Sequence, residues 1–181
     1  MSPTKPTFER LAALLALSGA LGVATLGMDS LLHAAGLAWV GRYLGIPGTI
    51  LIVASLSYSL RKRHLISIGS SRQFLAFHQF AGWLGSWLVL VHAGIHFNAP
   101  LPWLATLAMG INVVSGMVGK FFVIAGARVD PAEAPLDFAA SALVRRWRVI
   151  HLPIFFTFAA LAIAHIVSVL AFWNWPFADG R

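Results

Sequence analysis

Five long apolar stretches constrain this sequence more than any other feature. They occupy residues 11–28, 44–60, 74–97, 101–125 and 149–173. The hydrocarbon core of a bilayer is about 30 Å thick, and a helix needs roughly 20 apolar residues to cross it, so each stretch predicts a membrane span. The chain is 59% hydrophobic and only 10% charged, whereas a soluble domain is about a quarter charged. We therefore expect an all-α integral membrane bundle of about five helices, with residues 1–181 forming one domain.

The connections between the stretches alternate in charge. Arg61, Lys62, Arg63 and Arg72 flank the second connection, and Lys120, Arg128, Arg145, Arg146 and Arg148 flank the fourth. The third connection, residues 98–102, carries no charge. Because basic loops stay in the cytoplasm, this pattern predicts a cytoplasmic N-terminus and an external C-terminus. It also accounts for the formal net charge of +7 without a nucleic-acid partner.

The N-terminal part allows two interpretations. Residues 11–28 follow Lys5 and Arg10 and so share features with a secretory signal peptide, but we expect them to be the first membrane helix. Residues 29–43 form a semi-polar connection, for which we expect a short interfacial helix. Five tryptophans fall at predicted interfaces, where aromatic side chains are enriched: Trp39, Trp103, Trp147, Trp173 and Trp175.

Four of the seven histidines form two pairs with identical spacing. His78 and His92 lie in the third stretch, and His151 and His165 lie in the fifth, fourteen residues apart in both cases. Fourteen helical residues rise about 21 Å and return to within roughly 40° of the same face. The third and fifth spans run parallel because one span separates them. His78 is then level with His151 on the cytoplasmic side, and His92 is level with His165 on the outer side.

Two such pairs suit two haem groups. A haem iron takes axial nitrogens on its opposite faces, which neutral imidazoles supply. The chain has no cysteine, which excludes iron–sulfur clusters and covalent c-type attachment, so the prediction is two haems b. A lone histidine in an apolar helix is more often a packed residue, and the repeated spacing is what favours ligation. His96, one turn beyond His92, is an alternative ligand or a partner for a propionate.

Three further residues are candidates for haem contact. Gly85 lies midway between His78 and His92 on the same face, where it could leave room for a porphyrin or let its helix pack against a neighbour. Arg72 and Arg148 stand near the cytoplasmic ligands. Guanidinium groups suit propionate carboxylates, and lipid headgroups or membrane topology explain these arginines equally well.

The histidine segments carry a resemblance. The run from His78 to His92 reads HQFAGWLGSWLVLVH, and the segment ending at His151 reads RWRVIH. With His165, they resemble the ferric reductase-like transmembrane domain, a family that includes the membrane part of NADPH oxidases and the haem subunit of bacterial methionine sulfoxide reductase systems. The resemblance spans roughly residues 61–173. It implies paired haems b, electron flow across the membrane and a bacterial cytoplasmic membrane location.

Two departures from the family bear on the partners. We count five spans where the family commonly has six, and no flavin or nicotinamide domain follows the last span. We therefore expect a subunit of a hetero-oligomeric redox complex that exchanges electrons with a separate donor and acceptor, either protein or quinone. The alternative is a quinone-reactive cytochrome b anchor of a respiratory oxidoreductase, since the histidine spacing is shared with quinol-oxidising cytochromes. The predicted spans contain no carboxylate, which mildly disfavours a quinone site and a proton-coupled carrier.

Overall fold

The computed structural model describes residues 7–94, 99–124 and 136–172. Throughout these residues the regular structure is helical. In chain order the elements are α1 (Thr7–Ala34), α2 (Ala38–Tyr43), α3 (Gly45–Ser55), α4 (Ser57–Lys62), α5 (Ser71–Ala93), α6 (Pro100–Val118), the π-helix η1 (Gly119–Ile124) and α7 (Leu136–Phe172).

Five helical segments are long and apolar enough to cross a bilayer. They are Phe8–Ala34, Ala38–Lys62, Ser71–Ala93, Pro100–Phe122 and Val144–Phe172. Most of their large apolar side chains are exposed, as expected where lipid rather than water surrounds the bundle. The predicted fold class is confirmed, and the chain is a multi-pass membrane protein.

Two helix boundaries differ from the predicted ones. The first helix continues to Ala34 because Asp29 and His33 lie one turn apart, and His33 Nδ1 donates to the Asp29 carbonyl oxygen at 2.8 Å. The helical segment Phe8–Ala34 therefore includes Glu9 and Asp29 near its two ends, both outside the predicted span 11–28. The last helix begins at Leu136 rather than near residue 149, so the basic residues before His151 belong to the helix itself.

The second span is three short helices laid end to end. A short helix is present in the predicted connection as α2, but it leads through Leu44 directly into α3 and so belongs to the second span. Between α3 and α4 the backbone hydrogen bonding changes at Leu56 from the α-helical to a tighter three-residue pattern. There the Ser59 amide donates to the Leu56 carbonyl oxygen at 2.8 Å. That shift releases the Ser55 carbonyl oxygen from its usual partner in an α-helix, the amide four residues on.

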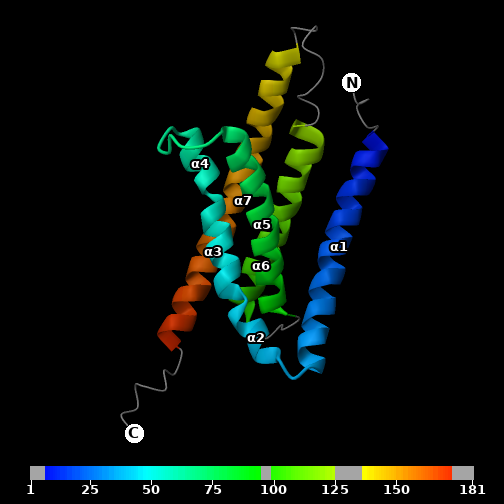
Figure 1. The fold of residues 1–181 in the computed structure, drawn as a ribbon, viewed down its shortest axis with the longest axis vertical. Coiled ribbons are helices and arrows are strands. Elements are labelled where there is room, and N and C mark those ends of the chain that lie inside the picture. The colour runs from blue at the N-terminus through cyan, green and yellow to red at the C-terminus, as the bar shows by residue number, and fades with distance from the viewer. Residues whose placement is uncertain (1–6, 95–98, 125–135, 173–181) are drawn as a thin grey trace.

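Two closely packed helix pairs make up the bundle (Figure 1). Helix α3 packs on α5, and α6 packs on α7. Between α5 and α7, in contrast, no two Cα atoms of the described residues approach within 8 Å. The two helices that carry the paired histidines are therefore held apart by their own packing partners, and only side chains span the space between them.

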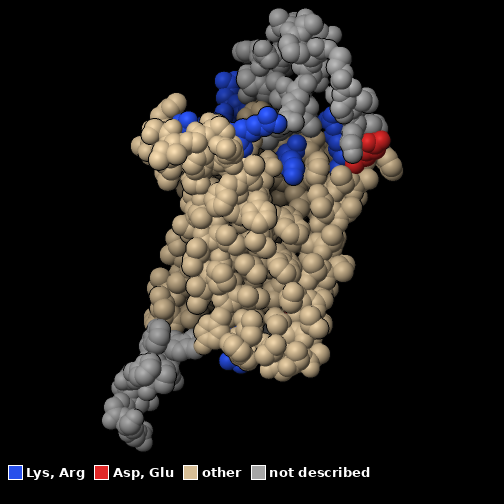
Figure 2. Space-filling model, viewed as in Figure 1, with Lys and Arg blue, Asp and Glu red and all other residues tan. Residues whose placement is uncertain are grey.

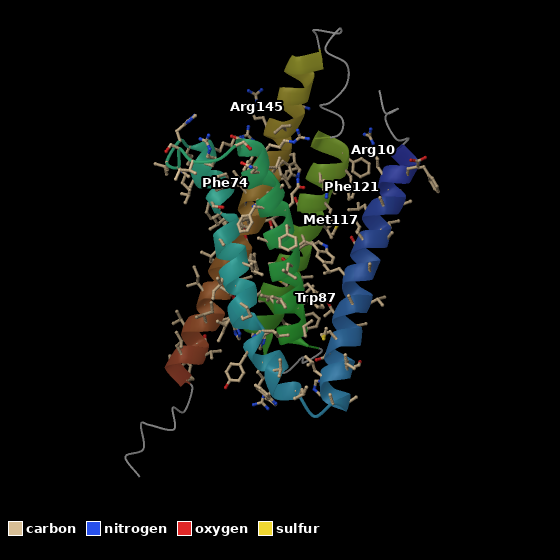
Figure 3. All side chains as sticks on the ribbon, viewed as in Figure 1. Arg10, Phe74, Trp87, Met117, Phe121 and Arg145 are labelled. Carbon is tan, nitrogen blue, oxygen red and sulfur yellow. The ribbon has the colours of Figure 1, made fainter. Side chains whose placement is uncertain are left out.

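The middle of the bundle is a small apolar core. Ala108, Met109 and Phe158 are buried there, with Val89 and Leu90 of α5 packed against them. Toward α1, Met117 accepts a hydrogen bond at its sulfur from Ser18 (3.6 Å; Figure 3). The core divides the space between α5 and α7 into two levels.

Candidate functional site: two histidine pairs between α5 and α7

One predicted pair, assigned above to the outer level, consists of His92 on α5 and His165 on α7. Their ring centroids are 6.4 Å apart, and the ring planes are inclined by 52°. Both side chains are half-buried. The two rings face each other across the space that the helix backbones leave open.

The second pair consists of His78 and His151, four helical turns nearer the end where α4 meets α5. These rings are close enough for a charge on one to oppose a charge on the other, as is also true of His92 and His165. The structure thus brings the rings of His92 and His165 together as the spacing predicts, and it places His78 and His151 within electrostatic range of each other. At about 1.5 Å per residue, the two levels lie roughly 21 Å apart.

His78 is oriented by the break in the second span. Its Nδ1 donates to the Ser55 carbonyl oxygen at 3.1 Å, the oxygen that the tightened turn at Leu56 released. The ring of Tyr58 lies 5.7 Å away, centroid to centroid. Because a carbonyl only accepts, Nδ1 must carry the proton, and Nε2 of the neutral ring keeps its lone pair for a metal.

His151 is oriented by α6 and by a residue of its own helix. Its Nδ1 lies 3.1 Å from the Ser115 hydroxyl oxygen, and the Trp147 ring stacks on it at 4.6 Å with an angle of 17°. Trp147 Nε1 donates in turn to the Ser115 carbonyl oxygen at 3.0 Å. Of the tryptophans predicted at the interfaces, Trp147 is half-buried against His151, Trp39 and Trp103 are exposed, and Trp173 and Trp175 lie outside the described residues.

His92 is oriented by a glycine rather than by a hydrogen bond. A Cβ atom at Gly45 would lie only 2.8 Å from the His92 ring, so the imidazole packs directly on the start of α3. The Nδ1 atom of His92 is buried and has no hydrogen-bond partner among the described residues. A buried polar atom without a partner costs free energy, which fits a ring whose partner is a bound group.

Gly85 has a different surrounding from the one predicted. A Cβ atom there would lie 2.8 Å from the Gly48 carbonyl oxygen and 2.9 Å from Ile52, so the position faces α3. Close approach of two helices explains the missing side chain. Gly85 therefore fits the packing interpretation rather than the porphyrin interpretation.

The two predicted arginines and the alternative ligand have different surroundings. Arg72 is exposed in the first turn of α5, and Arg148 is half-buried on α7. Arg148 Nε is buried without a hydrogen-bond partner in the described part of the chain, and Lys62 of α4 is close enough for the two charges to repel. His96 lies outside the described residues.

The donor set fits a planar cofactor better than a bare metal ion. The described residues contain no cluster of three or more His, Cys, Asp or Glu side chains, whereas a protein zinc site usually has at least three protein ligands. What they do contain is a pair of imidazoles at 6.4 Å, His92 and His165, and a second pair, His78 and His151, within electrostatic range of each other. No family model, curated protein or solved structure matches this chain.

Proposed function

We propose that the chain binds two haems b, one between His78 and His151 and the other between His92 and His165, and carries electrons across the bilayer. A haem iron that alternates between its ferrous and ferric states accepts and releases one electron at a time. The protein supplies four axial nitrogens, a dry surrounding and a fixed distance between the two levels.

One observation carries the proposal: the separation of the outer rings. An imidazole nitrogen binds a first-row metal at roughly 2 Å, and the ring centre lies about 1 Å further out. Two imidazoles on opposite faces of one iron therefore have centres roughly 6 Å apart. The centroids of His92 and His165 are 6.4 Å apart, and the backbones of α5 and α7 are held far enough apart to admit a flat group.

The orientation and partners follow from charge and from the expected chemistry. The described basic residues near α4 and the first half of α7 favour a cytoplasmic location for that end, in a bacterial cytoplasmic membrane. Arg148 is available to pair with a propionate of the cytoplasmic haem, because its buried Nε lacks a partner in the described residues. The electrons come from and go to other components of a redox complex.

A groove on α7 favours the quinone-reactive alternative as a second candidate. It measures about 400 Å³ and is lined by Arg145, Arg148, Val149, Leu152, Pro153 and Phe156. The groove is shallow and open, and its lining residues all belong to α7. Reduction of the haems by a soluble quinol analogue, lost in Leu152→Trp, would favour this candidate over a protein donor.

Haem content tests the proposal directly. The purified protein should give a b-type dithionite-reduced minus oxidised spectrum, and pyridine haemochrome analysis should give about two haems per chain. His78→Ala or His151→Ala should remove about half of the haem, since each haem is held by one pair. His64→Asn is the matched control, because His64 is exposed in a loop. Purified, folded protein without haem after expression with ample haem supply would contradict the proposal.

A further inference from the structure

We propose that Ser115 and Trp147 are positioning residues that fix the tautomer and orientation of His151 and lower the reduction potential of the cytoplasmic site. The inference depends on the proposed function, since it takes His151 to be an axial ligand. It goes beyond ligation by assigning a role to two residues outside the histidine pairs.

The hydrogen bond from His151 determines which nitrogen faces the cofactor. Nδ1 lies 3.1 Å from the Ser115 oxygen, and a hydroxyl oxygen can accept the proton that Nδ1 carries. With Nδ1 protonated, Nε2 is the nitrogen that can bind a metal. In the proposed arrangement His151 Nδ1 donates to the Ser115 hydroxyl, which, unlike the Ser55 carbonyl oxygen beside His78, can also act as a donor.

Trp147 contacts both Ser115 and His151, so the three residues, from two helices, all contact one another. Its indole stacks on His151 at 4.6 Å, and its Nε1 donates to the Ser115 carbonyl oxygen at 3.0 Å. The indole occupies the space where a Cβ atom at Gly119 would lie, so Gly119 is required for this placement. Gly119 also begins the π-helix η1, a local widening that often occurs at functional sites. The His151 ring is therefore held on one edge and on one face.

The electronic consequence has a definite sign. An imidazole that donates from Nδ1 becomes a more basic ligand at Nε2. A more basic ligand stabilises the ferric state over the ferrous state, which lowers the reduction potential. Removing the hydroxyl should therefore raise the potential of the cytoplasmic haem.

The effect should be confined to one haem. The outer ligand His92 has no corresponding hydrogen bond among the described residues, and it packs on Gly45 instead. Ser115 lies beside His151, four helical turns of α7 away from His165. A change at Ser115 that moved both potentials equally would reflect a general disturbance rather than the proposed contact.

Redox titration of the purified, haem-loaded protein tests the inference. The wave that disappears in His151→Ala identifies the cytoplasmic haem. In Ser115→Ala this wave should move to more positive potential while the other stays in place, and Ser115→Thr, which keeps a hydroxyl, should restore the parent value. Trp147→Phe, which keeps an aromatic face and loses the N–H donor, should shift the same wave in the same direction by a smaller amount. Ser168→Ala is the control, because that hydroxyl bonds its own helix at Ala164.

The outcomes separate this inference from the proposed function. A parent protein without haem contradicts the proposed function itself. A parent with two haems whose Ser115→Ala variant titrates at unchanged potentials overturns the inference alone. If Ser115→Ala loses the cytoplasmic haem, Ser115→Cys decides, because a thiol is a weaker hydrogen-bonding group of similar size. A partial positive shift in Ser115→Cys supports the role, and the parent potential overturns it.

Discussion

The four paired histidines are held by different physical means at the two levels. His78 Nδ1 donates a hydrogen bond to the Ser55 carbonyl oxygen, and His151 Nδ1 is hydrogen-bonded to the Ser115 hydroxyl. His92 is held by close packing against Gly45. A hydrogen bond fixes both the proton and the ring angle, whereas packing fixes only the ring position. The outer site therefore depends on the absence of a side chain at one residue.

Gly45→Ala tests that dependence. The new Cβ atom would lie 2.8 Å from two atoms of the His92 ring, so the ring must turn or the start of α3 must move. We expect the outer haem to be lost or to show an altered spectrum, with total haem falling by up to about half and the cytoplasmic haem retained. Gly110→Ala is the matched control, because nothing lies within 4 Å of its added Cβ atom. Equal haem content and identical spectra in both variants would contradict the role of Gly45.

The sequence predicts which histidines pair but not what holds them. The fourteen-residue spacing belongs to a single helix, so helix geometry alone brings His78 and His92, or His151 and His165, to one face. Ser55, Ser115 and Gly45 contact the histidines from other helices, and their contacts depend on how those helices are rotated and how closely they approach. Trp147 precedes His151 by one turn, so that stacking could have been inferred from i, i+4 spacing.

At the scale of elements, two glycines set the distance between α3 and α5. Added Cβ atoms at Gly48 and Gly85 would each lie 2.8 Å from the carbonyl oxygen of the other. This close approach brings the end of α3 to α5, so that the Ser55 carbonyl oxygen reaches His78. The packing of α3 on α5 therefore positions His78 from a distance of two helical turns.

Gly85→Ala should destabilise the bundle. Backbone atoms of α3 cannot move aside as a flexible side chain can, and overpacking typically costs about 1–3 kcal/mol. Gly82→Ala on the same helix provides the control, since nothing lies within 4 Å of its added Cβ atom. Unfolding of the detergent-solubilised variants, followed by circular dichroism, should give a lower midpoint for Gly85→Ala only. An unfolding midpoint for Gly85→Ala equal to that of the parent would contradict the packing interpretation and favour the porphyrin interpretation of Gly85.

The element boundaries show the limits of hydropathy as a guide. Five spans are predictable because each needs a long apolar run. Hydropathy ends the first span before Asp29, yet the helix continues because Asp29 and His33 satisfy each other one turn apart. It also places the start of α7 too late, since basic residues interrupt apolar runs without interrupting helices. Both errors come from polar residues that are compatible with helix at the membrane boundary.

For the molecule as a whole, the start of α1 and the end of α7 lie at opposite ends of the bundle (Figure 1). Helices α1 and α7 both begin at the end where α4 meets α5. Arg10 and Arg145 lie at this end (Figure 3). Figure 2 shows Lys and Arg gathered there on the visible face, above a broad surface without charged residues. The asymmetry favours this end as the cytoplasmic one.

Cysteine labelling in intact cells tests this orientation. The chain has no native cysteine, so single cysteines report without background. Ser67 lies in the α4–α5 connection and Ala99 immediately precedes α6, and both are exposed. An impermeant thiol reagent applied outside should label Ala99→Cys and leave Ser67→Cys unmodified until the cells are opened, because basic connections are retained in the cytoplasm. Labelling of Ser67→Cys alone in intact cells would invert the orientation and would make His92 and His165 the cytoplasmic pair. The haem held by His151 would then be the outer one. Ser115→Ala would still shift the reduction potential of that haem alone, but this haem would lie at the opposite end of the electron path.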